Sequence, residues 1–411
     1  MSNAPLAGKT VIDLTTALAG PYATLLLAGL GARVIKVENP SRGGDSSRNN
    51  SPYVTADGLS LRRTSPDDMS VSMMLRGRGK ESVTLNLKHP ESREVLFDLI
   101  RDADIVVENY SAGVTKRLGI DYASVRGLNE KLVYTSISGF GATDDHGDRK
   151  AMDTIIQALS GVMMTAGEPG DPPVRFGLPV GDLVAPLFAV IGTLAAVLQA
   201  DRTGEGQHVD VSMLGALTSL VACEPFDALE SVGFPLRTGA YVPRLAPFGT
   251  FRAVDGWFAI CAPTDQFAAG VLHALGRADL LETPDFATRD ARVANADRLH
   301  ALIAGWAAER TLAEILGALD ANGAPAAPVR TTAEAVRDPQ VTRRGEVVPL
   351  VHPTFGHFEG LYGAGLPMVF SSSKVGLDKP APGLGENTDA VLRAAGYDDE
   401  KIARLRAAGV L

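Results

Sequence analysis

Short runs of apolar residues alternate with longer amphipathic segments over the first 140 residues. The apolar runs are rich in β-branched side chains, and helical patterns separate them; the runs cover residues 10–14, 33–38, 82–87, 104–110 and 131–141. Continuous apolar runs of this length are typical of strands buried on both faces. Strands that alternate with helices predict βαβ units and a parallel sheet, so this part of the chain is expected to be α/β.

The pattern changes after about residue 220. Residues 249–263 read as two strands joined at Asp255-Gly256, a dipeptide that favours a hairpin turn. Helical patterns follow, and residues 323–340 are rich in proline and alanine, which suits a return connection. With 411 residues, the chain exceeds the usual size of a single core, so two domains are expected.

Composition narrows the class of protein. Hydrophobic residues make up 45% and charged residues 21% of the chain, as in ordinary globular proteins. The net charge of −9 argues against nucleic-acid and anionic-membrane partners. Only two cysteines occur, Cys223 and Cys261, which suggests a reducing compartment, and we expect a cytoplasmic protein.

The most apolar segment, residues 182–202, resembles a membrane span in length. Asp182 stands at its start as a helix cap, Pro186 interrupts it, and charged residues end it. These features predict a buried helix of a protein without membrane contact.

Several common catalytic motifs are absent from the sequence. The first strand-to-helix turn, residues 15–23 (TTALAGPYA), lacks G-x-G-x-x-G, and no G-x-x-x-x-G-K-[ST] occurs, so NAD binding is not expected. The seven histidines show no metal-ligand spacing, and no G-x-S-x-G elbow occurs. We therefore expect neither a metal site nor a serine hydrolase.

Two loops are candidates for chemistry. Residues 138–141 (SGFG) follow a predicted strand, so Gly139 and Gly141 form a backbone-lined turn where α/β proteins usually bind ligands. Residues 166–182 (AGEPGDPPVRFGLPVGD) hold Asp171 and Asp182 in a Gly/Pro-rich loop. On sequence alone, Asp171 is a turn residue and Asp182 a helix N-cap.

Nine stretches, in order, resemble the class III CoA-transferase family of the formyl-CoA and carnitine type, which also contains α-methylacyl-CoA racemases. They include LAGKTVIDLTTALAGPYATLLLAGLGARVIKVENP, GGDSSR, ADIVVENYSAGVTKRLGIDY, DTIIQALSG and TGEGQHVDVSML. The resemblance implies an α/β fold in an interlaced homodimer. A Rossmann-like, parallel-sheet large domain would comprise residues 1–220 and 331–411, and a smaller α+β domain residues 221–330.

The resemblance also implies an activity. The family's transferase members move CoA from an acyl-CoA to a carboxylic acid through an aspartyl anhydride and an aspartyl-CoA thioester. Asp171 matches the family's nucleophile, and Asp182 an acid shared by many members. A carboxylate is ionised near neutral pH without a basic partner and can attack a thioester, which is already activated. Backbone N–H groups at Gly139 and Gly141 are the expected oxyanion donors.

Coenzyme A, as acyl-CoA substrate, is the implied ligand. The family's CoA contacts fall on Ala17, Leu18, Ala19, Leu85, Lys88, Asn109, Tyr110, Arg117 and Leu118, and Arg48 and Lys80 are further candidates for phosphate contacts. Arg244 is either a partner for the free carboxylate of a dicarboxylic acceptor or an exposed loop arginine.

Two alternatives stay open. A racemase or epimerase would use Asp182 as acid/base, but the racemases carry a His-Asp pair where this chain has Met152-Asp153. A CoA-binding protein with a degraded site is the other: some relatives carry the aspartate at the position of Gly170, and Leu18 replaces a glutamine. Ser138 replaces a lysine of formyl-CoA transferase and that enzyme's glycine-rich lid is absent, so a formyl-CoA:oxalate enzyme is not expected.

Overall fold

The computed structural model describes residues 3–142, 149–242 and 244–411. The chain forms two compact units. The larger unit comprises residues 1–160, 177–221 and 336–411, and the smaller unit comprises residues 161–176 and 222–335.

A six-stranded parallel sheet forms the centre of the larger unit. Its strands, in spatial order, are β6 (Lys80–Thr84), β2 (Arg33–Glu38), β1 (Thr10–Asp13), β7 (Ile105–Glu108), β8 (Val133–Ser138) and β9 (His208–Ser212). The chain builds outward from β1 to one side and then from β7 to the other. The order therefore reverses between β1 and β7, which is where open α/β sheets usually bind their ligands.

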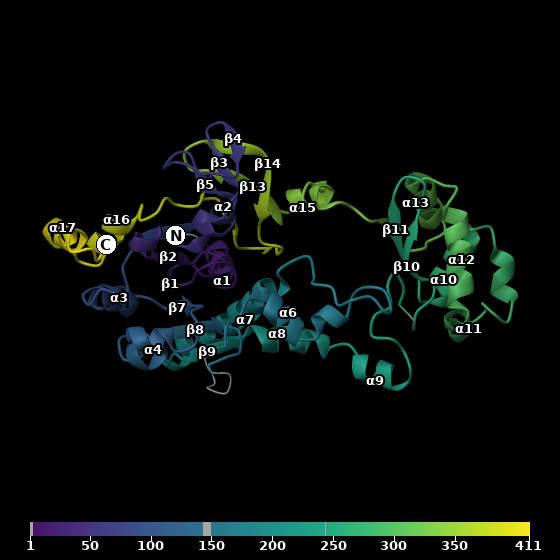
Figure 1. Cartoon of the computed structure of the whole chain (residues 1–411), viewed down its shortest axis with the longest axis horizontal. Helices are drawn as coiled ribbons and strands as arrows, with labels where there is room; N and C mark the ends of the chain where they lie inside the picture. Colours follow the sequence, from purple (N-terminus) through teal and green to yellow (C-terminus); the bar gives the residue numbers. More distant parts are fainter. Residues whose placement is uncertain (1–2, 143–148, 243) are drawn as a thin grey trace. The chain divides into compact units, whose positions relative to one another are not determined.

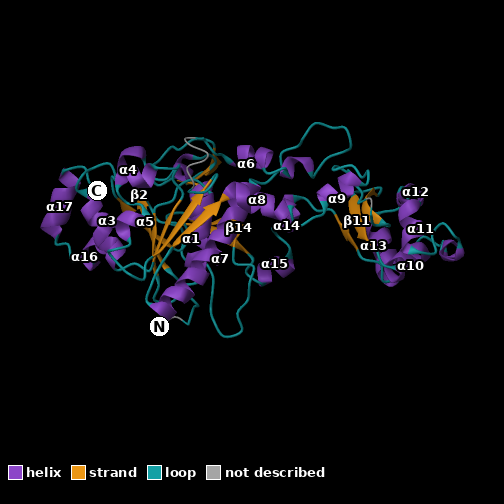
Figure 2. Ribbon diagram, turned by 90° about the horizontal axis from the view of Figure 1, so that it is seen from below, coloured by secondary structure: helices purple, strands orange, loops and turns teal. Residues whose placement is uncertain are grey.

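Helices cover both faces of this sheet (Figures 1 and 2). On one face, α1 (Ala19–Gly29) and α7 (Val180–Thr203) pack on each other and on the strands. On the other, α3 (Ser92–Arg101), α16 (Thr388–Ala394) and α17 (Asp399–Ala407) close the core. The remaining helices of the unit are α2 (Val71–Arg76), α4 (Val114–Leu118), α5 (Tyr122–Val125), α6 (Asp153–Leu159), α8 (Met213–Val221) and α15 (Pro339–Arg343).

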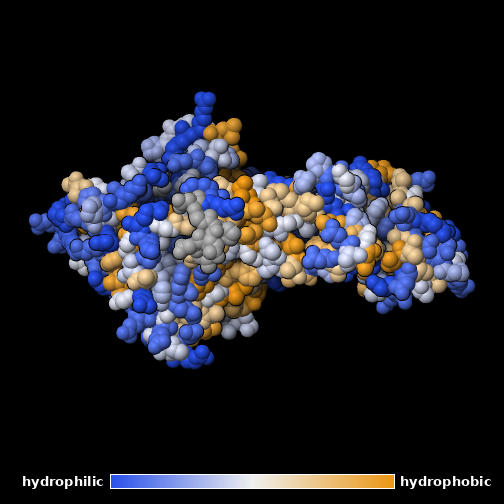
Figure 3. Space-filling view, turned by 60° about the horizontal axis from the view of Figure 1, so that its bottom comes forward, coloured by the Kyte–Doolittle hydropathy of each residue, from blue (hydrophilic) through white to orange (hydrophobic). Residues whose placement is uncertain are grey.

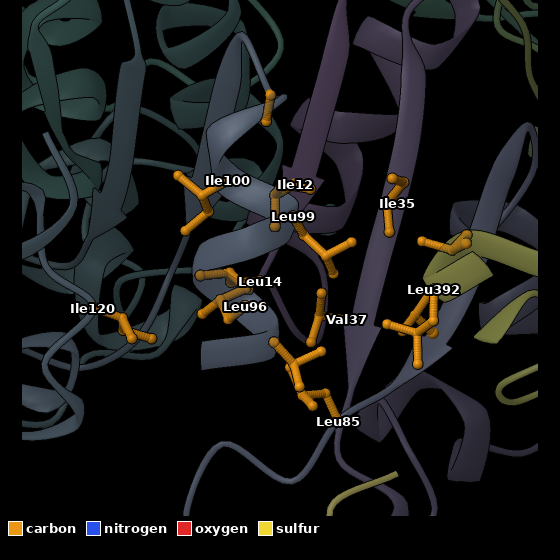
Figure 4. Close-up of a cluster of buried hydrophobic side chains, with 14 of the residues drawn as sticks. Ile12, Leu14, Ile35, Val37, Leu85, Leu96, Leu99, Ile100, Ile120 and Leu392 are labelled. Carbon is orange, nitrogen blue, oxygen red and sulfur yellow. The ribbon is translucent and has the colours of Figure 1, made fainter. Parts of the chain in front are cut away.

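The core beneath α3 shows why the apolar runs became strands. Ile12, Ile35 and Val106 point from three neighbouring strands toward Leu96 of α3, and all four are buried. Figure 4 shows this cluster with Leu392 of α16 at its edge. Successive side chains of a strand point to opposite faces of the sheet. One face packs on α3 and the other on α1 and α7, so both faces are buried and the strands are apolar throughout.

The end of the chain lies along the edge strand β6. The Ser82 N–H donates to Asn387 Oδ1 at 2.9 Å, and the Asn387 N–H donates to the Ser82 carbonyl at 2.9 Å. Asn86 N–H donates to the Val410 carbonyl at 2.8 Å. These bonds hold the last residues of the chain in the same unit as its first residues.

Two small antiparallel sheets complete the larger unit. One contains β3 (Tyr53–Thr55), β4 (Gly58–Ser60) and β5 (Met69–Ser70), and the other β13 (Val347–His352) and β14 (Gly356–Ala364). Residues 62–79, which are polar and then methionine-rich, run through β5 and α2, where Met73 and Met74 are fully buried beside Leu350 of β13. The methionines therefore have a packing role.

The smaller unit is α+β. Its antiparallel sheet contains β10 (Phe248–Arg252), β11 (Trp257–Cys261) and β12 (Ala326–Pro328). β10 and β11 are the predicted hairpin across Asp255-Gly256. The helices are α9 (Phe226–Ser231), α10 (Asp265–Ala274), α11 (Arg289–Ala294), α12 (Ala296–Ala307), α13 (Leu312–Ala321) and α14 (Thr332–Ala335).

The domain boundaries differ from the prediction. The loop 161–176, which contains Asp171, and residues 331–335 belong to the smaller unit, whereas the prediction places both in the large domain. Gly239 N–H donates to the Gly167 carbonyl at 3.0 Å, and Arg237 Nη1 donates to the Pro172 carbonyl at 2.8 Å. These long-range bonds have no signature in the local sequence.

α7 is the segment that resembled a membrane span. Among the described residues it is the one helix long and apolar enough to cross a membrane, and 44% of its most apolar stretch is buried. It was predicted to be buried; in the single chain it is buried on one side, against α1 and β8. Leu187, Ile191 and Leu198 on the other side are exposed.

Candidate functional site

A cavity of about 500 Å³ lies at the carboxyl ends of the central strands. Its walls come from the segments that follow β1, β2, β6 and β7. Three exposed cations, Arg42, Lys88 and Arg117, stand on an otherwise largely apolar wall that includes Leu85, Leu118 and Tyr110. Cations beside an apolar slot suit a ligand with phosphates at one end and a flat ring at the other.

A second cavity, of about 210 Å³, adjoins the first, because Thr16, Tyr110 and Ser111 line both. The ends of β1, β7 and β8 and the start of α7 form its walls. Of the residues expected to bind CoA or to catalyse, it is lined by Ala17, Leu18, Ala19, Asn109, Tyr110, Gly139, Gly141 and Asp182. Leu85, Lys88, Arg117 and Leu118 line the first cavity. The structure thus gathers most of the predicted site around one edge of the sheet.

The turn between β1 and α1 is held from several sides. The Asn109 side chain makes two hydrogen bonds to the Thr16 backbone. Its Oδ1 accepts from the Thr16 N–H at 2.8 Å, and its Nδ2 donates to the Thr16 carbonyl at 2.9 Å. Ala17 N–H donates to Asp45 Oδ1 at 3.0 Å, and Arg76 Nη1 donates to the Ala17 carbonyl at 3.0 Å. Among the described residues, Ala17 is the one non-glycine with a positive φ, 68°. A fixed backbone of this kind preorganises the wall of the cavity.

The buried ion pair of Lys36 and Asp45 stabilises the turn between β1 and α1. Lys36 Nζ lies 2.7 Å from Asp45 Oδ2 and donates to the Thr15 carbonyl at 2.8 Å. Burial opposes the charge on Lys36, but Asp13 and Asp45 outweigh it and raise the pKa of Lys36 above its usual value. Lys36 and Asp45 therefore remain charged and hold the turn in place.

Arg48 and Lys80 differ from the expectation that they contact phosphate. Arg48 donates to both oxygens of Glu38, at 2.7 and 2.6 Å, and Lys80 Nζ donates to Asp13 at 3.0 Å and Thr24 at 2.7 Å. Both are buried, and neither lines either cavity. Their donors satisfy buried groups of the sheet, so the CoA site is better described without them.

Arg42 is the cation that sequence reasoning missed. It stands in the short helical turn Pro40–Arg42, after β2, and is exposed on the wall of the larger cavity. Its one signal was its position just before Gly43-Gly44, in a loop that follows a central strand.

The turn after β8 separates the two predicted oxyanion donors. A Cβ on Gly139 would lie 2.1 Å from Cβ of Ala151, so this position needs glycine. Gly141, however, donates its N–H to Ser138 Oγ at 2.9 Å. The Gly141 donor is therefore already used, and the expectation that it stabilises an oxyanion does not fit this structure.

Asp182 lies on the wall of the smaller cavity at the start of α7. Burial, and then the neighbouring Asp153, raise its pKa to about 6, although Arg76 acts in the opposite direction. Asp153 is fixed by Gly181 N–H at 2.8 Å and by Gln157 Nε2 at 2.7 Å. Asp182 therefore takes up and releases a proton close to neutral pH.

Asp171 lies in an exposed turn of the smaller unit. Its N–H donates to the Glu168 carbonyl at 3.2 Å, and Gly170 before it has φ +87°. The turn is thus formed by backbone bonds and leaves the carboxylate accessible to solvent.

Comparison with known proteins identifies the family. The family described as CoA-transferase family III matches residues 6–388. The chain belongs to CoA-transferase family III. It is accordingly an enzyme that transfers CoA, with a CoA thioester as substrate.

Relatives of known name lie within this family. Succinate–glutarate CoA-transferase of Agrobacterium fabrum is 34% identical over 389 residues, covering 94% of this chain and 95% of that protein. Succinyl-CoA:mesaconate CoA-transferase of Haloarcula marismortui is 37% identical over 396 residues, covering 94% and 96%. A solved structure of a CaiB/BaiF family protein from Brucella suis superposes with a TM-score of 0.82 at 33% identity, over 96% of this chain and 100% of that one.

Proposed function

We propose that the protein moves CoA from an acyl-CoA to a carboxylic acid, with Asp171 as nucleophile. The observation that carries CoA binding is the pair of adjoining cavities where the strand order reverses, with Arg42, Lys88 and Arg117 on the wall of the larger one. Asp171 is proposed as nucleophile because it matches the family's nucleophile and its turn is exposed. These cations would bind the phosphates of CoA, and the apolar wall its adenine ring.

The reaction starts with attack of the Asp171 carboxylate on the thioester carbonyl. The C–S bond breaks, CoA leaves as thiolate, and an aspartyl anhydride forms. The thiolate then attacks the aspartyl carbonyl, which releases the first acid as its carboxylate and leaves an aspartyl-CoA thioester. The acceptor carboxylate attacks this thioester and displaces the thiolate. Return of the thiolate to the acceptor's carbonyl frees Asp171 and forms the new acyl-CoA.

Asp182 and Gly139 supply polar groups at the smaller cavity. The pKa of Asp182 is about 6, so its carboxyl group is protonated at a pH below that value and can then donate a hydrogen bond to a substrate oxygen. Gly139 lines this cavity and would offer its backbone N–H; the position needs glycine because a Cβ there would meet Ala151.

We also propose that two chains form the interlaced homodimer that the resemblance implies. Large apolar side chains are exposed on neighbouring helices of the larger unit, and Figure 3 brings this hydrophobic surface forward. They are Met152, Ile155 and Leu159 of the α6 region, Leu187, Phe188, Ile191 and Leu198 of α7, and Leu220 of α8. An exposed apolar surface of this extent favours a partner chain. Cys223 and Cys261 are both exposed, and accessible thiols suit the cytoplasmic location that we propose.

Trapping of the intermediate tests the mechanism. The full-length protein is incubated with succinyl-CoA, acetyl-CoA or octanoyl-CoA, quenched with hydroxylamine or borohydride, and mapped by peptide mass spectrometry. Modification of Asp171, and its loss in Asp171→Asn with CoA binding retained, is the expected result.

The same samples distinguish the alternatives. Exchange of the α-proton of a branched acyl-CoA with solvent deuterium, dependent on Asp182 and without modification of Asp171, would identify a racemase. CoA binding with neither modification nor exchange, across these donors, would identify a binding protein with a degraded site.

A further inference from the structure

A third cavity, of about 350 Å³, lies within the smaller unit. Its wall is mostly apolar and includes Phe226, Leu229 and Phe234, which are half-buried. None of the residues predicted to bind CoA or to catalyse lines it. Its volume is in the range of small-molecule sites.

This cavity and the turn that carries Asp171 belong to the same structural body. Thr165, from the loop 161–176, lines the cavity, and so do Leu236 and Thr238 on either side of Arg237. Arg237 itself donates to the carbonyl of Pro172, the residue after Asp171, at 2.8 Å. The segment that holds the Asp171 turn in place is thus also a wall of the cavity.

The charges at this cavity cancel. Arg244 Nη2 lies 2.8 Å from Glu224 Oε2, and both residues line the cavity. The pair is about half exposed, with side-chain exposures of 43% and 53%. An exposed pair of this kind contributes little to stability. A carboxylate that approaches Arg244 also approaches Glu224, so the pair offers such a ligand no net attraction.

We infer that this cavity receives the hydrocarbon chain of the acyl group carried by Asp171, and that Glu224, by neutralising Arg244, makes it select monocarboxylic over dicarboxylic acids. The inference rests on the proposed function of Asp171. During the anhydride steps the acyl group is covalently attached to Asp171, which lies in the same loop as Thr165 of the cavity wall, and the inference is that its chain extends from there into the cavity. An apolar wall with no net charge favours an uncharged chain.

The inference sets this enzyme apart from the relatives reported above. Their names refer to succinate, glutarate and mesaconate, which are dicarboxylates. With Glu224 in place, a second carboxylate on the substrate must displace that side chain from Arg244 before it binds.

Acceptor selectivity tests the role of Glu224. We compare kcat/KM for octanoate and glutarate as acceptors, in the full-length enzyme and in Glu224→Gln, Glu224→Gln/Arg244→Gln and Glu230→Gln. Glu230 lies on α9 but not on the cavity wall, so it is the matched control. The wild type should prefer octanoate, and Glu224→Gln should raise the glutarate-to-octanoate ratio about tenfold, because freed Arg244 can bond the second carboxylate.

The gain should disappear in the double variant and be absent in Glu230→Gln. A wild type that prefers glutarate, or equal ratios in Glu224→Gln and Glu230→Gln, would overturn the inference while leaving CoA transfer intact.

A binding measurement tests the cavity without turnover. Saturation-transfer NMR with octanoate alone should show contact with the wild type, a loss of at least about fivefold in Leu229→Trp, which fills the cavity, and no change in Val232→Trp, an exposed position beside it. Equal signals in both tryptophan variants, or none with the wild type, would overturn the inference. Failure of Asp171 labelling instead would count against the proposed mechanism.

Discussion

At the scale of single residues, two lysines that were expected to share a role have opposite surroundings. Lys80 is buried and bonded to Asp13, whereas Lys88 is exposed on the wall of the larger cavity. Removal of Lys80 would leave the buried Asp13 with Lys36, 3.9 Å away, as its remaining cation, and breaking a buried ion pair costs about 3–5 kcal/mol. The two residues therefore predict two separable phenotypes.

Lys80→Met should lower the free energy of unfolding by about 3 kcal/mol or more. Lys88→Met should leave it within about 0.5 kcal/mol and weaken CoA binding instead. Urea unfolding and calorimetric titration with CoA measure the two quantities. Equal CoA affinity in Lys88→Met and wild type would remove Lys88 from the proposed site.

The proton on Asp182 predicts a pH dependence. With a raised pKa of about 6, the protonated form is present below that pH and is lost above it, so a step that needs the donor should slow as pH rises from about 5 to 8. In Asp182→Asn the carboxamide donates at every pH, and the slope of kcat over this interval should flatten. An unchanged slope would show that another group titrates.

Single-residue chemistry was only partly readable from the sequence. Lys36 and Glu38 lie in a strand that otherwise reads as apolar, and a charge inside such a run already implies a buried partner. Asp45, which pairs with Lys36, lies in the loop that follows. The partner's identity depends on strand order, which no local pattern contains. The same holds for Arg48 and Lys80: their residue types predict exposure, whereas the structure buries both against carboxylates.

At the scale of elements, the turn from β1 into α1 depends on a glycine. A Cβ on Gly20 would lie 2.4 Å from Cβ of Thr15 and 3.0 Å from Cγ of Asn109, the side chain that clasps Thr16. Gly20 is buried at the start of α1, so the added atom has nowhere to go.

Gly20→Ala should therefore lower both CoA affinity and the free energy of unfolding, despite the better helix propensity of alanine. Gly305, in α12, has open space around its Cβ position and no left-handed φ. Gly305→Ala should stabilise the protein by up to about 1 kcal/mol. Thermal unfolding of the two variants, with CoA titration, checks this contrast; a stabilised Gly20→Ala would refute the close approach.

Elements were the most predictable level. The apolar runs became β1, β2, β6, β7 and β8, and Asp255-Gly256 joins a hairpin, because local periodicity and turn chemistry determine these features. The short strands β3, β4 and β5 were not expected, since two to three residues carry no periodic signal.

At the scale of the whole molecule, the exposed side of α7 predicts association. Ile191 is 64% exposed in the single chain. If the proposed homodimer buries this side, Ile191→Glu should shift the protein toward monomer in light scattering while its circular dichroism stays unchanged. Leu61→Glu, at a residue 79% exposed outside these helices, should remain dimeric. A wild-type monomer would contradict the proposed assembly.

Chain length predicts two compact units but not every position at which the chain passes from one unit to the other. The resemblance predicts that both chain ends lie in one unit. The loop 161–176 is the main exception to the predicted division, because it is bonded to residues 237 and 239 of the smaller unit.

That exception bears on how such enzymes can be recombined. The proposed nucleophile belongs to the smaller unit, yet its segment is separated in the gene from residues 222–335, which form the rest of that unit. A single crossover would pair an Asp171 turn from one parent with the supporting wall of another. A chimera that exchanges acceptor preference should therefore need four breakpoints, near residues 161, 177, 222 and 336. Both segments of the smaller unit then come from the same parent.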